Sequence, residues 1–166
     1  IELQSWYTSS NLDDYAEYID TSIGFCSDRN MASGHTWSSQ PSSTIRYAAY
    51  GRLNTNKSPS LSCTTSDIIP EPVGLITADE VAFAGGVYGT NNTSYYLYNN
   101  QYYWTMSPSY FYSAGRASVL YVYTTGYLSN YYVYGTTPSV RPVINLKADI
   151  KFIGEGTADS PFEVAT

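Results

Sequence analysis

The chain has 166 residues, a length that fits one domain with a substantial core. It carries 8 basic and 14 acidic residues, a formal net charge of −6, which argues against nucleic acid or an anionic membrane as partner because both attract clustered Lys and Arg. No apolar stretch reaches the length of about 18 residues that a membrane-spanning helix needs. Because residue 1 already opens a folded-looking segment, we expect a mature piece or the C-terminal part of a longer chain.

The first predicted element is a helix over residues 11–20, which Asn11 can cap. Its apolar residues recur at i, i+3, i+4 and i+7 and give one hydrophobic face, composed of Leu12, Tyr15, Ala16 and Ile19. Residues 27–44 are polar and rich in Ser, and residues 54–72 contain several prolines, so both segments predict loops. Between them, residues 45–53 predict a strand.

The clearest local signal lies between residues 73 and 86. Residues 73–76 are mostly apolar and predict a short buried strand. Thr77 stands three residues before Glu80, which is the capping-box pattern at the start of a helix. The pattern predicts a short helix over residues 78–84, which the glycines at 85 and 86 end because glycine accepts the left-handed conformation at little cost.

Residues 88–134 hold 14 of the 19 tyrosines and one charged residue, Arg116. Alternation and turn residues predict strands over residues 95–98, 101–106, 117–123, 128–134 and, interrupted by Pro142, 140–146. The loop at 124–127 joins two of these strands as a hairpin, with Gly126 where a positive φ is needed. Two short helices followed by antiparallel hairpins and long loops predict an α+β fold, in one domain that spans residues 1–166.

Cys26 and Cys63 are the two cysteines of the chain. An even count, together with few Lys and many Ser, Thr, Tyr and Asn, is typical of an oxidising compartment. We therefore predict a Cys26–Cys63 disulfide that closes a loop of about 37 residues. The alternative is a pair of buried free thiols in a cytosolic protein.

Six short motifs are spread over most of the chain: CSDR at 26–29, VGLITADEV at 73–81, YWTMSP at 103–108, ASV at 117–119, GYL at 126–128 and VRPVINL at 140–146. Together they resemble uncharacterised surface domains of gut Firmicutes. Those domains are similar to the C-type-lectin-like fold that formylglycine-generating enzymes share with the variable proteins of diversity-generating retroelements. The resemblance implies a C-type-lectin-like fold and a place on a cell surface or phage virion. It does not imply the enzyme activity, because the C-terminal half of this chain has no cysteine pair.

In the retroelement proteins, mutation of template adenines changes Asn-type codons at positions near the C-terminal end, between fixed core residues. This chain has a similar arrangement, which implies ligand-binding positions at Tyr110, Tyr112, Tyr121, Tyr123, Tyr127, Asn130, Tyr131, Tyr132 and Tyr134. Arg116 lies among them, and Arg with Tyr is the usual pairing at binding hot spots. Arg141, directly before Pro142, is instead expected to be a framework residue that donates to backbone carbonyls.

A tyrosine-rich surface with few charges is physically suited to binding. Tyr offers a large rigid contact with only two torsions to order, while Ser, Gly and Asn add adaptable polar contacts, as in antibody paratopes. Adjacent pairs such as Tyr131 and Tyr132 send one ring to each face of a strand, so about half of the rings should point outward. We expect an extracellular adhesin or receptor-binding domain for a protein or a glycan. The alternatives are tyrosines that simply fill strands, or that bury an oligomer interface in a structural domain.

The sequence predicts no lectin-type metal site, no cofactor and no catalytic site. An alternative without a specific motif is a structural calcium ion among Asp13, Asp14, Asp20 and Asp28. The calcium loops of C-type lectins are matched only by Glu-Pro-Val at 71–73 and Gln-Pro-Ser at 40–42, which do not supply the roughly six to eight oxygen ligands of Ca²⁺. His35 is the only histidine, and Cys26–His35 is the one conceivable Cys–His pair, nine residues apart in the sequence. An unusual enzyme of the same fold is therefore the least favoured hypothesis.

Overall fold

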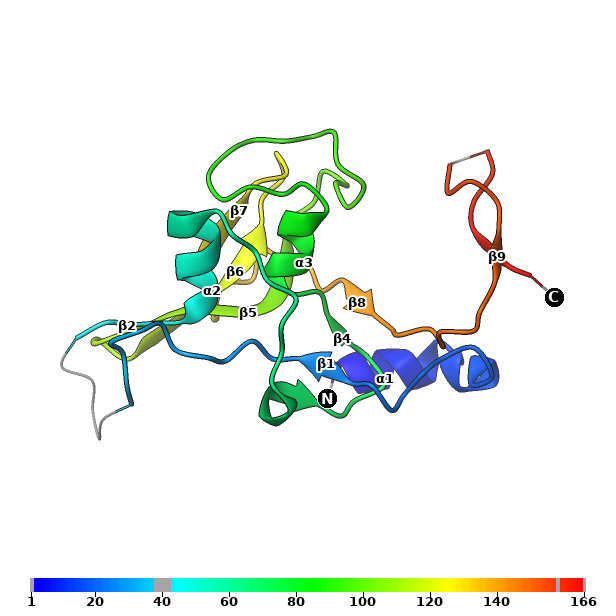
Figure 1. Cartoon of the computed structure of the whole chain (residues 1–166), viewed down its shortest axis with the longest axis horizontal. Helices are drawn as coiled ribbons and strands as arrows, with labels where there is room; N and C mark the ends of the chain where they lie inside the picture. Colours follow the sequence, from blue (N-terminus) through cyan, green and yellow to red (C-terminus); the bar gives the residue numbers. More distant parts are fainter. Residues whose placement is uncertain (1, 38–42, 158, 166) are drawn as a thin grey trace.

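The computed structural model describes residues 2–37, 43–157 and 159–165 and has a mixed α+β architecture of short helices and antiparallel sheets (Figure 1). Part of the loop predicted over 27–44, including the Gln-Pro-Ser triplet at 40–42, lies outside the described residues. The centre of the fold is a four-stranded antiparallel sheet in the spatial order β2, β5, β6, β7. These strands are Ile45–Arg46 (β2), Tyr103–Tyr112 (β5), Arg116–Val122 (β6) and Leu128–Tyr132 (β7).

Short two-stranded antiparallel sheets join segments that are distant in the sequence. The pairs are β1 (Phe25–Cys26) with β3 (Ile68–Ile69), β4 (Gly74–Leu75) with β8 (Pro142–Val143), and β9 (Phe152–Ile153) with β10 (Glu163–Val164). The segments that follow β4 and precede β8 also bond to β5: Met106 donates its N–H to the Ile76 carbonyl at 2.8 Å, and Trp104 donates to Ser139 at 3.1 Å. The free edge of β5 is therefore covered along its first half.

The helices of the described chain are short. They are α1 (Glu2–Ser9), the 3-10 turns η1 (Leu12–Tyr15) and η3 (Thr65–Asp67), α2 (Ala48–Tyr50) with its π-helical continuation η2 (Gly51–Asn56), and α3 (Ala78–Phe83). Helices α2, η2 and α3 pack on one face of the central sheet, which we call the helix-side face; the opposite one is the outer face (Figure 1). The main core consists of Ala49, Leu53, Ala78, Val81, Tyr95, Tyr103, Leu120, Val122 and Leu128.

Several local predictions are confirmed. At the start of α3, the Thr77 hydroxyl accepts the Glu80 N–H at 3.2 Å, and the Glu80 carboxylate accepts the Thr77 N–H at 2.7 Å, which completes the capping box. Gly126 closes the β6–β7 hairpin with a φ of 81°. Arg141 has the framework role that we expected, because it donates to the Leu97 carbonyl at 2.8 Å and lies over the ring of Tyr103.

The helix predicted over residues 11–20 is wrong. The first helix is α1, and residues 11–20 contain the short η1 turn, before which Asn11 takes a left-handed φ of 53° and makes no side-chain cap. Leu12 and Ile19 do pack together, in a second small core with Tyr7 and Val73. Tyr15 and Ala16, the other members of the predicted apolar face, are exposed, so that face does not form.

Several predicted strands have other bounds or are absent. The strand predicted over 101–106 begins later and runs on to Tyr112 as β5, and those predicted over 73–76 and 128–134 are shortened to β4 and β7. Of residues 45–53 only β2 is extended, because Ala48 and Ala49 are good helix formers and begin α2. Residues 95–98 form a turn, which the Tyr98 N–H closes on the Tyr95 carbonyl at 3.0 Å. Only Pro142–Val143 remains of the strand predicted over 140–146.

We expect Gly126→Ala to lower the free energy of unfolding by more than about 2 kcal/mol, and Gly115→Ala by only about 1–2 kcal/mol. Both glycines have a positive φ, 81° and 76°, which strains any side chain. A Cβ at Gly126 would also overlap the Asn92 carbonyl oxygen, whereas nothing lies within 4 Å of one at Gly115. Urea unfolding of the two variants measures the difference; equal losses would mean that backbone strain acts alone.

Candidate functional site

An irregularity in β5 decides which tyrosines share a face of the central sheet. The cross-strand pairs are Trp104 with Tyr121 and Pro108 with Val119, then, after a register shift, Tyr110 with Ser118 and Tyr112 with Arg116. Ser118 is two residues from the core residue Leu120 on β6 and shares its face, so its partner Tyr110 also lies on the helix-side face. The register shifts on both sides of Pro108, between Trp104 and Pro108 and again between Pro108 and Tyr110; proline has no N–H for the ladder. The sheet therefore carries aromatic side chains on both faces.

The outer cluster is the aromatic group on the outer face. It comprises Tyr102, Trp104, Tyr121, Tyr123, Tyr127 and Tyr131. Tyr121 is its centre, with ring centroids 5.6 Å from Tyr131 and 6.2 Å from both Tyr102 and Trp104. Burial, aided by the neighbouring tyrosines, raises the pKa of Tyr121 to about 12, so its hydroxyl stays protonated at neutral pH. A pocket of about 170 Å³ opens between these rings and Pro138.

The cationic cluster lies on the helix-side face, beyond the part of the sheet that the helices cover. It comprises Tyr50, Tyr88, Tyr110, Tyr112, Tyr132 and Tyr134, with Asn130, Arg46, Lys57 and Arg116. The rings touch in series, from Tyr50 and Tyr110 with centroids 4.5 Å apart to Tyr132 and Tyr134 at 5.2 Å. The Tyr88 hydroxyl donates to Asn130 at 2.7 Å and so links the series back to β7.

Three cations of this cluster stand over tyrosine rings. Arg116 lies 5.2 Å from the centroid of Tyr132, Lys57 lies 5.8 Å from that of Tyr88, and Arg46 lies 5.9 Å from that of Tyr110. The ion pairs found in the described residues are formed by Arg29 and Arg52 and by none of these three. No Asp or Glu occurs between residues 81 and 148. The surface is thus locally positive on an acidic chain, and its charges are not neutralised by carboxylates.

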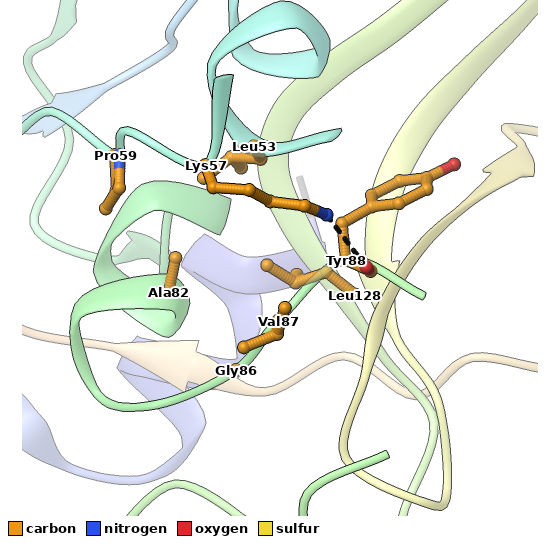
Figure 2. Close-up of a pocket in the computed structure, with 8 residues that line it drawn as sticks. All are labelled: Leu53, Lys57, Pro59, Ala82, Gly86, Val87, Tyr88 and Leu128. Atoms are coloured by element: carbon orange, nitrogen blue, oxygen red, sulfur yellow. Dashed lines mark hydrogen bonds between the residues drawn. The ribbon is translucent and has the colours of Figure 1, made fainter. Parts of the chain in front are cut away.

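A cavity beneath the cationic cluster is smaller than typical small-molecule sites. It encloses about 100 Å³ between Leu53, Val87 and Leu128, and Lys57 crosses its rim to donate to the Tyr88 carbonyl at 3.1 Å (Figure 2). Typical small-molecule sites enclose about 300–1,000 Å³. Burial raises the pKa of Tyr88 to about 12, so this ring is also neutral. Recognition at this end of the molecule would therefore occur on the surface of the cluster.

The structure divides the ten predicted binding residues between the two clusters. The outer cluster contains Tyr121, Tyr123, Tyr127 and Tyr131; the cationic cluster contains Tyr110, Tyr112, Arg116, Asn130, Tyr132 and Tyr134. Sequence reasoning missed Tyr50, Arg46, Lys57 and Tyr88. The first two lie in a segment that we predicted as a strand, and no local signal brings any of them to the sheet. Trp104 could have been found, because it alternates with the buried Tyr103 and Thr105.

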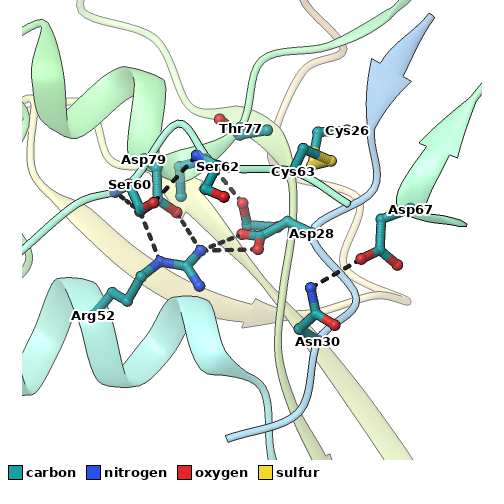
Figure 3. A network of polar contacts seen from close by, with 12 residues as sticks. Cys26, Asp28, Asn30, Arg52, Ser60, Ser62, Cys63, Asp67, Thr77 and Asp79 are labelled. Carbon is teal, nitrogen blue, oxygen red and sulfur yellow. Dashed lines mark hydrogen bonds and ion pairs between the residues drawn. A yellow bond between two sulfur atoms is a disulfide. The ribbon is translucent and has the colours of Figure 1, made fainter. Parts of the chain in front are cut away.

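The predicted disulfide between Cys26 and Cys63 is confirmed, and such a bond is compatible with an extracellular protein. Beside it, Arg52 joins two buried carboxylates, with Nη2 2.7 Å from Asp79 and 2.8 Å from Asp28 (Figure 3). The Ser60 N–H, from the loop that Cys63 anchors, donates to Asp79 at 2.7 Å. Burial raises the pKa of Asp28, although Arg52 opposes the shift. Because Arg52 pairs with both acids, this network crosslinks the fold, and a pocket of about 140 Å³ lies beside it.

Cys26, His35 and Glu71, the residues considered for catalysis or lectin-type calcium binding, have partners within the chain. Cys26 carries no thiol in the disulfide, and His35 accepts the Arg46 N–H at 3.4 Å. The Glu71 carboxylate of the 71–73 triplet accepts a hydrogen bond from Gln4. Over residues 2–37, 43–157 and 159–165, no three His, Cys, Asp or Glu residues are grouped to hold a metal ion, and no helix is long and apolar enough to cross a membrane.

The candidate site is thus a pair of aromatic clusters on opposite faces of one sheet, which meet at β7. Both reach solvent there, since 38% of Tyr131 and 63% of Tyr134 are exposed. Searches with protein-family models, curated proteins and solved structures found no match to this chain.

Proposed function

We propose that this chain is an extracellular ligand-binding domain of a bacterial surface protein or a phage virion, with a C-type-lectin-like fold. It binds a protein or a glycan through its aromatic clusters, without covalent chemistry. The observation that carries the proposal is the collection of tyrosines into two packed, solvent-reaching clusters. One of them holds three cations that form no ion pair with a carboxylate of the described residues.

Packing between the rings supports binding on energetic grounds. A tyrosine held by its neighbours loses little conformational freedom when a ligand arrives, so less of the contact energy is spent on ordering side chains. The exposed faces remain available for stacking on sugar rings or on apolar side chains. Arg116 adds the donor-rich partner that accompanies tyrosine at binding hot spots.

The ligand test uses one exposed tyrosine from each cluster. We expect Tyr131→Ala or Tyr134→Ala to weaken, by about tenfold or more, the binding of a ligand selected on a glycan array or from a displayed library of random linear peptides. Tyr96→Ala is the control, because Tyr96 is 79% exposed and belongs to neither cluster. A ligand that all three variants bind equally well would contradict the proposal. If no ligand is found, and light scattering shows self-association that the cluster variants abolish, the tyrosines form an oligomer interface instead.

We further propose that these positions are diversified, as in the retroelement proteins that the sequence resembles. Sequencing the gene segment for residues 103–145 across many clones of the source population tests this directly. Substitutions should concentrate at Tyr110, Tyr123, Asn130, Tyr131 and Tyr132, while Trp104, Gly126 and Arg141 stay constant. A uniform segment would mean a domain of fixed specificity.

A further inference from the structure

The backbone of β7 is open at the place where the two clusters meet. In the described chain β7 is the last strand of the central sheet. The Val133 N–H donates to the Ala117 carbonyl of β6 at 3.1 Å. Because every second residue of an antiparallel strand bonds to the same neighbour, the odd-numbered residues of β7 direct their backbone N–H and C=O groups toward β6. Asn130 and Tyr132, the alternate residues, therefore turn their N–H groups away from the sheet.

The chain itself occupies only the start of this edge. Leu128 donates to the Val87 carbonyl at 3.1 Å and accepts from the Gly89 N–H at 3.0 Å. Beyond it, within the part of the chain that the structure describes, no backbone group pairs with the Asn130 N–H and carbonyl or the Tyr132 N–H. Natural edge strands are commonly protected by charged residues, proline or a bulge, and β7 has neither a charge nor a proline.

The charges beside this edge favour an acidic partner. Arg116 stands over the ring of Tyr132, and Arg46 and Lys57 lie farther along the same cluster. All three side chains are exposed. Because no carboxylate of residues 2–37, 43–157 or 159–165 is within ion-pair distance of them, an incoming Asp or Glu would not have to displace a partner from that part of the chain.

We propose that β7 binds an extended acidic segment of another polypeptide, which adds to the sheet as a further strand along Asn130 and Tyr132. The proposal rests on the binding function proposed above and names its ligand. The open main-chain groups favour a polypeptide over a glycan, because only a polypeptide continues the ladder. Alternate side chains of the added strand would lie over the outer cluster and over the cationic cluster, with the acidic ones toward Arg116.

The probe is a linear peptide selected on the domain from a displayed random library, then synthesised and titrated by fluorescence anisotropy. We expect the selected peptides to be rich in Asp and Glu and to lose affinity as salt rises. Arg116→Glu should weaken binding about tenfold or more, and Lys151→Glu, the same charge change at an exposed residue outside both clusters, should not. Selected peptides without acidic residues, or an equal response of the two variants, would overturn the proposal.

Main-chain pairing is tested separately from charge. Tyr132→Pro removes the open N–H, and Tyr132→Val removes the same ring but keeps the N–H, so the proline variant should bind more weakly than the valine variant. N-methylation at alternate residues of the peptide should abolish binding in one register and be tolerated in the other, a result that needs no altered protein. If both tests show no dependence on backbone N–H groups, edge pairing is ruled out. If a glycan binds in an Arg116-dependent way and the library yields no peptide, this inference is refuted but the binding function is supported. If neither a peptide nor a glycan binds, both are refuted.

Discussion

Replacing Arg52 by methionine is expected to lower the free energy of unfolding by about 3–5 kcal/mol, the cost of removing one partner from a buried ion pair. The side chains of Asp28 and Asp79 are only 9% and 2% exposed, so both carboxylates would be left charged in a poorly solvated place. Arg52 itself is 24% exposed, which moves the expected loss toward the lower end of that range. Urea unfolding with the disulfide intact measures it.

Two controls distinguish the cost of leaving two buried carboxylates unpaired from the cost of losing the packing contacts of Arg52. Adding Asp28→Asn and Asp79→Asn to Arg52→Met removes the stranded charges and should recover most of the stability. Asn suits position 28, where φ is 50°, because Asn tolerates the left-handed conformation. Arg29→Met should cost less than about 1 kcal/mol, since Arg29 is 62% exposed and 3.8 Å from Asp67. No recovery in the triple variant would mean that Arg52 acts through packing.

The pH dependence gives a further check on the same network. Burial raises the pKa of Asp28 above its value of 3.8 in an unfolded chain, so the folded protein holds this proton more tightly. The contribution of Asp28 to stability therefore falls as pH rises from about 4 through the raised pKa. Arg52 opposes the shift, so its loss should raise the pKa of Asp28 further. The deficit of Arg52→Met should be largest at neutral pH and shrink on acidification.

Removing the disulfide with Cys26→Ala and Cys63→Ala is expected to cost about 4 kcal/mol. The bond spans 37 residues, and a loop of that length restricts the unfolded chain by about this amount in the chain-entropy description. Part of the stability loss should come from the folded state, because the loop that Cys63 anchors donates the Ser60 N–H to Asp79 and this hydrogen bond should weaken without the disulfide. The measurement is urea unfolding of the double variant against the oxidised wild type.

Reduction of the wild type provides the matched control for this prediction. Reduced wild type and the double alanine variant should unfold at similar urea concentrations, because both lack the covalent link. Combining the double variant with Arg52→Met should cost less than the sum of the separate losses, since the disulfide and the ion network hold the same loop. An unchanged midpoint on reduction would show that the loop is already ordered by its noncovalent contacts.

Local structure could be predicted from the sequence wherever a few neighbouring residues decide the backbone conformation. Thr77 and Glu80 specify the start of α3 by bonding each other's backbone, and Gly126 specifies the hairpin turn by its positive φ. The α+β class followed from such signals. The strand prediction for residues 45–53 was wrong because a short apolar run fits a strand or a buried helix equally well. The packing of Ala49 and Leu53 in the core beside the sheet selects the helix.

The sequence by itself determined the disulfide, the tyrosine-rich segment and most strands of the central sheet, because composition and turn chemistry act over short distances. Only the tertiary structure decided which tyrosines stand together. The register shift at Pro108 moves Tyr110 and Tyr112 to the face opposite Trp104, and a shift of one residue reverses every side chain after it. Arg46 reaches Tyr110 through the pairing of β2 with β5, and Lys57, which follows η2, reaches Tyr88; the two residues of each contact are more than 30 positions apart in the sequence. Contacts of that kind depend on the whole chain, and no local pattern encodes them.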